Sequence, residues 1–440
     1  MTRKAPGASH RRDDSPVSAV LIAVQSPERD DLAVQRSMAE LTSLAAGLGL
    51  AVTHTAVQRR AEPAPQTWLG EGKLREIAEL TGGSGEVPRG LTPPSASDQR
   101  LVVLADDELS PAQRRNLEGA LGVPILDRTE VILRVFEARA KSREAKLQVE
   151  LARLQVELPR IRDDHSMSDR EGGGGRAARG ASNVELAKQR LRTRMAAIRT
   201  ELANLGDQTA PRDGDDPLRV ALVGYTNVGK STLMRALTGS DVLVADKLFA
   251  TLGTTTRQLS PPWVPPLVMV DSVGFLDRLP HGLIASFRST LSEARDSDLL
   301  LLVVDASDPA AERQLAVTHE VLAEIGAAEL PWLLVLNKAD RLDADQRAAW
   351  LGRYPQAVLV SALQPGDVVA LRAAFLERLA ESLQTEVMEL PWSAAQGLAA
   401  MRGHIQVLHE DSAETLTVTV RGRPAALAKL RSRVANQAVQ

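Results

Sequence analysis

The apolar residues of the first third of the chain fall into short continuous runs separated by segments with helical spacing. The runs predict buried strands, and they are Ala19–Val24, Ala51–Ala56 and Leu101–Ala105. The predicted helices between and after them are Asp31–Leu48, Gly72–Leu80 and Pro111–Leu121, the last with Ser110 as N-cap and Gly122 as its stop. This alternation predicts a small α/β domain over residues 17–130, and the polar, basic residues 1–16 predict a disordered tail.

The hydrophobic period changes after Val131, where leucines recur at steps of three and four. The first stripe consists of Leu147, Leu151, Leu154 and Leu158. The second consists of Val184, Leu191, Met195, Ile198, Leu202 and Leu205. Two long helices with matching stripes predict an antiparallel helical hairpin within residues 131–212.

A break from Asp163 to Ser182 separates these two helices and contains Gly172–Gly175 together with Arg170, Arg176 and Arg179. Residues 131–200 hold 16 Lys/Arg against 9 Asp/Glu, although the whole chain has a net charge of −3. The break fits either a flexible linker or a basic loop at the tip of a helical arm, placed to contact phosphate. The sequence supports these two interpretations equally.

Buried runs separated by helical stretches continue through residues 213–384. They are Leu218–Val223, Leu267–Val270, Leu299–Val304, Trp332–Leu336 and Ala357–Val360, and they predict a doubly wound, mostly parallel sheet. Residues 385–440, a piece that begins at about Glu386, then offer an amphipathic helix, two alternating runs and a last helix. The runs are His404–His409 and Thr415–Val420, and the helix is Pro424–Val434, which together predict a small α+β domain.

Composition narrows the functional classes. The 440 residues are 44% hydrophobic and 25% charged, which is typical of a globular protein of several domains. The absence of cysteine excludes disulfides, thiolate metal sites and cysteine nucleophiles. No apolar run has the length of a membrane span, and 3% aromatic residues argue against a protein that binds single strands by base stacking.

One loop carries a specific chemical pattern. Its residues are Gly224, Tyr225, Thr226, Asn227, Val228, Gly229, Lys230 and Ser231, which match G-x-x-x-x-G-K-[ST] between a predicted strand and a predicted helix. Glycines allow backbone N–H groups to surround a β-phosphate, and the helix N-terminus adds partial positive charge. Lys230 can bridge the β- and γ-phosphates, and the Ser231 hydroxyl can ligate Mg²⁺. The loop therefore predicts a nucleotide site.

Three further motifs follow the ends of predicted strands. Asp271, Ser272, Val273 and Gly274 form D-x-x-G, in which the Asp can hold magnesium through water and Gly274 can donate its N–H to a γ-phosphate. Asn337, Lys338, Ala339 and Asp340 form the second motif, and Ser361, Ala362 and Leu363 form the third. The Asp340 carboxylate accepts two hydrogen bonds only from a base with a ring N–H beside an amine, which is guanine. The order of the four motifs predicts that GTP is bound.

Two residues bear on the rate of hydrolysis. Many GTPases place a water-orienting Gln after D-x-x-G, whereas this chain has Phe275, so we expect slow intrinsic hydrolysis that a partner stimulates. Asn227 fits either a loop-stabilising side chain or a ligand of K⁺ beside the phosphates.

The chain resembles the HflX family of ribosome-associated GTPases, relatives of the Obg group, in several segments outside these motifs. In the GTPase region they are the predicted switch Phe249, Ala250, Thr251, Leu252 and Gly253 with Thr254–Thr256, and the run from Asp271 to Phe287. In the N-terminal half they are Thr67–Lys73, Asp106–Pro111, Leu126–Thr129 and Ala140–Glu150. The resemblance implies an α/β fold with a central P-loop GTPase domain, an N-terminal α/β domain with a helical hairpin, and a small C-terminal α+β domain.

The resemblance also implies a function. HflX-like proteins bind the large ribosomal subunit in their GTP form, split stalled or idle ribosomes, and leave after hydrolysis. It implies that Thr251 joins Ser231 on Mg²⁺, that Lys230, Thr251 and Gly274 serve hydrolysis, and that Arg170, Arg176 and Arg179 meet ribosomal RNA. A cytoplasmic monomer, in part at a membrane surface, is expected.

The sequence departs from the family pattern in the tip loop, where Arg179–Glu185 lacks the usual Pro-Gly-Glu core. Gly253 and Ser272 replace an acidic residue and a Thr. Two alternatives stay open: a GTPase of RNA processing or ribosome assembly, and a switch that binds a protein effector. The first lacks two of its usual signals, since the chain has neither cysteine nor a G-x-x-G after residue 385.

Overall fold

The computed structural model describes residues 17–88, 101–140, 142–161, 177–206, 216–239, 255–271, 274, 294–392, 395–412 and 415–438. The chain divides into two compact units, residues 1–135 and residues 136–440. The expected tail at residues 1–16 and the linker after residue 206 lie outside the described residues.

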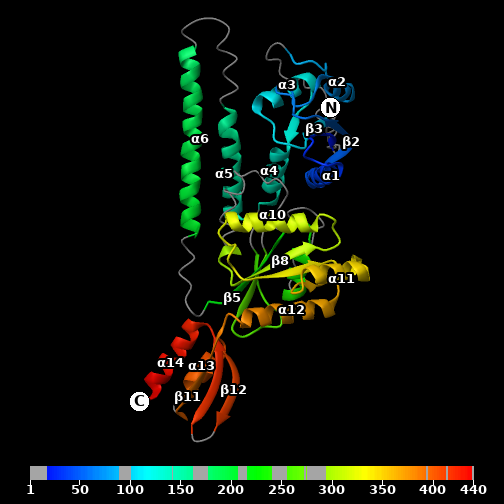
Figure 1. Cartoon of the computed structure of the whole chain (residues 1–440). Coiled ribbons are helices and arrows are strands. Elements are labelled where there is room, and N and C mark those ends of the chain that lie inside the picture. Colours follow the sequence, from blue (N-terminus) through cyan, green and yellow to red (C-terminus); the bar gives the residue numbers. More distant parts are fainter. Residues whose placement is uncertain are drawn as a thin grey trace, which may run out of the picture. The chain divides into compact units, whose positions relative to one another are not determined.

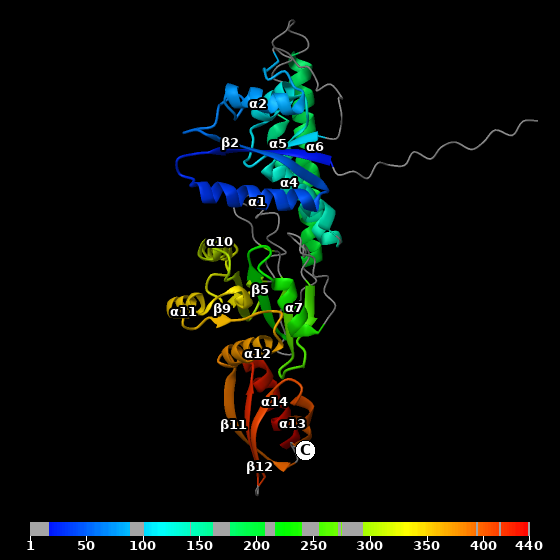
Figure 2. The same ribbon diagram turned by 90° about the vertical axis from the view of Figure 1, so that its right-hand side faces the viewer.

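The N-terminal unit is built on a parallel sheet with the strand order β2-β1-β3-β4. Its strands are β1 (Val17–Gln25), β2 (Leu50–Arg59), β3 (Leu101–Ala105) and β4 (Ile125–Asp127). Its helices are α1 (Asp31–Gly47), α2 (Glu71–Thr81) and α3 (Pro111–Leu121), with α4 (Arg128–Arg139) following β4. Helices α1 and α2 lie on opposite faces of the sheet (Figure 2).

The predicted ends of α3 are confirmed in detail. Ser110 forms a capping box with Gln113, and Gly122 has a φ of 68°, in the left-handed region that glycine adopts without strain. The hydroxyl of Ser110 accepts from the Gln113 N–H, which satisfies one of the donors at the start of the helix. These caps explain why the helix begins and ends where the sequence indicates.

The segment Leu126–Thr129, noted above as a family signature, holds the ion pairs of this unit's interior. Arg128 donates to Asp106 at 3.0 Å and to Glu40, and the Ser37 hydroxyl donates to Asp106 at 2.8 Å. Asp106 is fully buried, so loss of Arg128 would leave a buried charge without this partner. The role that these contacts indicate is structural.

Two helices, α5 (Arg143–Arg160) and α6 (Ala177–Gly206), form the predicted hairpin (Figure 1). The buried centre of their interface consists of Leu147, Leu151, Met195 and Ile198. Arg143 pairs with Glu201 and Arg194 with Glu150, a register that requires antiparallel helices. The expected break ended at Ser182, but α6 begins at Ala177. The intervening residues include three alanines and no proline, so helix propensity extends the helix into the predicted loop.

The central domain has a six-stranded sheet in the order β10-β9-β8-β5-β7-β6. The strands are β5 (Leu218–Gly224), β6 (Thr255–Gln258), β7 (Leu267–Asp271), β8 (Leu299–Asp305), β9 (Trp332–Asn337) and β10 (Val358–Leu359). All pairings are parallel except that of β6 with β7. The helices are α7 (Lys230–Thr238), α10 (Ala311–Glu324), α11 (Ala344–Arg353) and α12 (Pro365–Ala380). Residues of α7 and α12 share one core with the sheet, and residues of α10 share the other.

The C-terminal domain is a three-stranded antiparallel sheet in the order β11-β13-β12, packed against two helices. The strands are β11 (Gln384–Leu390), β12 (Gln406–Ser412) and β13 (Leu416–Gly422), and the helices are α13 (Ala395–Met401) and α14 (Pro424–Ala438). The expected amphipathic helix is α13, and the strand β11 that precedes it was not predicted. Residues 384–390 pair with β13 along their length, so strand pairing decides a segment whose spacing was ambiguous.

Candidate nucleotide site

The phosphate loop lies between the carboxyl end of β5 and the first residue of α7, as the motif requires. Gly229 has a φ of 96°, and a Cβ there would overlap the Asn337 amide nitrogen. Gly224 has a φ of 150°, and a Cβ there would overlap the Val303 carbonyl oxygen. Only glycine fits at both positions, because the loop follows the neighbouring strands closely.

Lys230 and Ser231 occupy the centre of this loop. The Lys230 ammonium donates to the carbonyl oxygens of Gly224 at 2.9 Å and Tyr225 at 2.7 Å. Burial lowers the pKa of Lys230 to about 8, and the nearby charge of Asp271 opposes that shift. A bound triphosphate would supply the anionic partner that this buried ammonium requires.

The Ser231 hydroxyl donates to a carboxylate oxygen of Asp271 at 3.1 Å. A hydroxyl and a carboxylate side by side are oxygen donors of the kind that Mg²⁺ selects, and magnesium sites retain several water and phosphate ligands. Within the described residues, no group of three or more His, Asp or Glu side chains is arranged so that it could hold a metal ion. Ser231 and Asp271 thus fit magnesium that is bound together with nucleotide phosphates.

Gly274 is placed against the phosphate loop. An added Cβ would lie 3.0 Å from the Lys230 ammonium and 2.9 Å from the Thr226 methyl group. Gly274 and the phosphate loop therefore meet at the point where the two motifs predict a γ-phosphate. Ser272, Val273 and Phe275 lie outside the described residues.

The base-recognition motif is tied to the phosphate loop by its first two residues. The Asn337 amide donates to the Val228 carbonyl at 2.7 Å and accepts from the Ala362 N–H at 3.1 Å. Lys338 donates to the Asn227 carbonyl at 2.8 Å. Members of the second and third predicted motifs, Gly274, Asn337 and Lys338, thus lie against the phosphate loop, and the fourth is joined to it through Asn337.

Asp340 is exposed at the end of β9, in a short 3-10 helix (Ala339–Arg341). A hydrogen bond from Ser361 is the main cause that lowers the pKa of the Asp340 carboxyl, with smaller contributions from Arg341 and Lys338. The carboxylate is consequently ionised at neutral pH and accepts hydrogen bonds only. Leu363 is also exposed.

One residue that the sequence analysis did not predict, Asp305, helps to position Lys338. It ends β8 and forms an ion pair with Lys338 at 2.7 Å, which holds the lysine stem beside the phosphate loop. Its signal was available, since an Asp at the carboxyl end of a strand next to β9 falls on the binding edge of a parallel sheet.

Asn227 has a φ of 61°, a left-handed conformation that asparagine tolerates better than most residues. Together with the bond from Lys338, this supports the loop-stabilising interpretation of Asn227. The other predicted contacts, Phe249, Ala250, Thr251, Leu252 and Gly253, lie outside the described residues.

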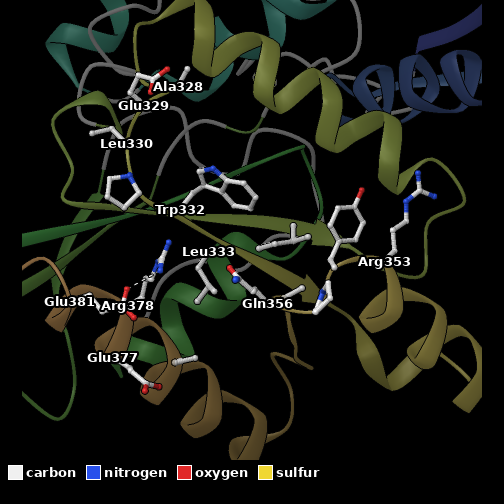
Figure 3. Close-up of a pocket in the computed structure, with 16 residues that line it drawn as sticks. Ala328, Glu329, Leu330, Trp332, Leu333, Arg353, Gln356, Glu377, Arg378 and Glu381 are labelled. Carbon is white, nitrogen blue, oxygen red and sulfur yellow. Dashed lines mark hydrogen bonds and ion pairs between the residues drawn. The ribbon is translucent and has the colours of Figure 1, made fainter.

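A cavity of about 910 Å³ opens at a different place in this domain (Figure 3). Its walls include Trp332, Leu333 and Tyr354, with Glu377 and Arg378 from α12. Trp332 begins β9, whereas the phosphate loop follows the end of β5, and these strands run parallel. The cavity therefore lies at the opposite edge of the sheet and is no part of the nucleotide site.

Three protein families match consecutive parts of this chain. Residues 219–338 match a family described as 50S ribosome-binding GTPase. Residues 35–137 match the GTP-binding GTPase N-terminal family, and residues 139–212 match the GTP-binding GTPase middle region. A protein of Gluconacetobacter diazotrophicus named GTPase HflX is 46% identical over 95% of this chain and 98% of its own length. The chain belongs to the HflX family.

Two further proteins are similar to this chain at lower identity. GTPase HflX of Escherichia coli is 36% identical over 86% of this chain and 87% of its own length. The crystal structure of a GTP-binding protein from Sulfolobus solfataricus in complex with GDP is 24% identical, with a TM-score of 0.43 over 83% of this chain and 99% of that one. Its membership of the HflX family shows that the protein is a GTPase, which binds guanine nucleotide and hydrolyses GTP to GDP and phosphate. None of the helices in the described ranges is long and apolar enough to cross a membrane.

Proposed function

We propose that the protein is a cytoplasmic translation factor that binds the large ribosomal subunit in its GTP form and splits stalled or idle ribosomes. The observation that carries the proposal is the pairing of a GTPase domain with a stiff helical hairpin in one compact unit. Residues 219–338 match a family described as 50S ribosome-binding GTPase, which agrees with such a partner.

The hairpin has the properties of an arm. Helix α6 spans 30 residues, a length of about 45 Å at 1.5 Å per residue. Its apolar seam and the two cross-helix ion pairs oppose bending. Such an arm can carry the arginines at and before its second helix toward ribosomal RNA, whose phosphates attract guanidinium groups.

Arg170 and Arg176 lie outside the described residues, and Arg179 falls in the first turn of α6. We propose that these three arginines contact ribosomal RNA phosphates. Because α6 begins at Ala177, Arg179 belongs to this helix and not to the loop that the sequence predicted.

Hydrolysis provides the release step of the cycle. We propose that Lys230 and the Gly274 N–H stabilise charge on the transferred phosphoryl group, and that Ser231 and Thr251 would hold Mg²⁺, which would supply positive charge to the phosphates. With Phe275 in place of a water-orienting Gln, intrinsic hydrolysis is slow and the large subunit stimulates it. Release of phosphate then ends binding.

Sedimentation through sucrose separates this proposal from the alternatives. The full chain is mixed with purified ribosomes and either GDP or a non-hydrolysable GTP analogue. We expect the protein to co-migrate with the large subunit only when the GTP analogue is present. Co-migration with the small subunit would instead support a ribosome-assembly GTPase. Absence of association in both nucleotide states would remove the proposal and favour a switch that binds a protein effector.

Charge substitution tests the arm. Replacing Arg170, Arg176 and Arg179 by Ala is expected to weaken association and to reduce its dependence on salt. The matched control replaces three exposed arginines elsewhere, Arg353, Arg378 and Arg402, which removes equal charge. Equal losses in both triple variants would show that net charge, and not the hairpin tip, determines binding.

A further inference from the structure

One hydroxyl in the phosphate loop lacks a hydrogen-bond partner. Thr226 is 6% exposed, and its Oγ1 is buried without a partner in the part of the chain that the structure describes. A buried hydroxyl that bonds to nothing is unfavourable, because water would have satisfied it in the unfolded chain. Residues that carry such a cost in a binding loop are candidates for contact with a ligand.

The surroundings of Thr226 indicate which group of the nucleotide its hydroxyl would contact. A Cβ added to Gly274 would lie 2.9 Å from the Thr226 methyl carbon, 3.0 Å from the Thr226 Cα and 3.0 Å from the Lys230 ammonium. Thr226, Lys230 and Gly274 therefore converge on one point. Lys230 and the Gly274 N–H are the groups that a phosphate loop and a D-x-x-G motif direct at the γ-phosphate.

We infer that the Thr226 hydroxyl donates a hydrogen bond to a γ-phosphoryl oxygen of GTP. The oxygens of that group are acceptors only, so the hydroxyl acts as the donor and obtains the partner that it lacks in the protein alone. The methyl and hydroxyl groups share one Cβ, and rotation about the Cα–Cβ bond brings either of them to the side of Gly274. GDP lacks this phosphoryl group and cannot make the contact.

The contact matters for hydrolysis as well as for binding. Negative charge spreads over the equatorial oxygens of the transferred group in the transition state, and a donor held beside them stabilises that charge. Phe275 cannot supply such a bond from the position that holds Gln in many GTPases. Thr226 thus supplies, from the phosphate loop itself, a donor that distinguishes the triphosphate from the diphosphate.

The test compares three variants of the full chain without ribosomes, so its outcome is independent of the proposed translation role. Thr226→Val removes the hydroxyl at nearly constant volume, Thr226→Ser keeps it, and Thr226→Ala removes both groups. The measurements are the affinities for GDP and for a non-hydrolysable GTP analogue, and the single-turnover hydrolysis rate at saturating GTP. We expect Val and Ala to lose about tenfold in analogue affinity or in rate. GDP affinity should stay within twofold, and Ser should restore the wild-type values.

Two results would overturn the inference. Wild-type values for both γ-phosphate-dependent measurements in the Val and Ala variants would show that the hydroxyl makes no such contact. A parallel loss of GDP affinity would show that Thr226 only shapes the loop. Should the Val variant fail to fold, the Ala and Ser pair makes the same comparison.

Discussion

The predicted role of Asp340 in recognising the base can be tested quantitatively with Asp340→Asn. Ser361 holds the pKa of the carboxyl below its usual range, so the group is anionic at pH 7. In the predicted base site it would accept from guanine's ring N–H and its amine. Hydrogen bonds to a charged acceptor contribute about 1.5–3 kcal/mol each. Asparagine keeps one neutral acceptor and turns a donor toward the amine. We therefore expect GDP affinity to fall about 10²- to 10⁴-fold, since about 1.4 kcal/mol corresponds to tenfold.

The same substitution should favour xanthine, which carries a carbonyl where guanine carries the amine. Competition titrations against a fluorescent nucleotide measure GDP and xanthosine diphosphate with both the wild type and the variant. Asp345→Asn, on an exposed position of α11, is the matched control and should change neither affinity. A variant that bound GDP within threefold of wild type, without tighter binding of xanthosine diphosphate, would refute this account of base choice.

Four further predictions concern other parts of the structure. Nucleotide phosphates favour the ammonium form of Lys230, whose pKa is about 8 in the free protein. Binding therefore takes up a proton above that pH, and GDP affinity measured by calorimetry should fall about fourfold from pH 7 to pH 8.5, with little change below pH 7. Gly229→Ala should abolish detectable nucleotide binding, because the new Cβ meets the Asn337 amide and the φ of 96° suits only glycine. Ile198→Ala, at a fully buried position between α5 and α6, should lower the free energy of unfolding of the hairpin by about 2–4 kcal/mol, while GDP affinity is retained. Hydrogen exchange of the hairpin amides at increasing urea concentrations measures this change. Hydrolysis rates in equal concentrations of sodium and potassium chloride should agree, because Asn227 adopts a loop-stabilising conformation; faster hydrolysis in potassium would instead assign Asn227 to a K⁺ site.

Those parts of the fold that depend on local signals could be predicted from the sequence. The apolar runs of β1, β5 and β8 are fully buried on both faces of a sheet, which leaves a continuous hydrophobic pattern that a helix of their length rarely shows. The phosphate loop was recognisable because its glycines are fixed by close contacts with neighbouring strands, at Val303 and Asn337.

The parts that depend on distant contacts could not be predicted in the same way. Strand β11 exists because residues 384–390 pair with β13, which follows it by about thirty residues. The partners of Lys338 in Asp305 and Asn227 come from two other segments of the chain. The start of α6 at Ala177 was obscured by glycines and arginines that suggested a loop, although alanines there favour helix.

The most direct test of the proposed translation role measures ribosome integrity. Purified ribosomes are mixed with the full chain and either GTP, a non-hydrolysable analogue or GDP, and light scattering records the fraction of intact ribosomes over time. The account predicts a fall in scattering with GTP and with the analogue, none with GDP, and a much weaker fall when Arg170, Arg176 and Arg179 are replaced by Ala. Unchanged scattering in all three nucleotide states, from protein that binds GTP normally, would contradict it.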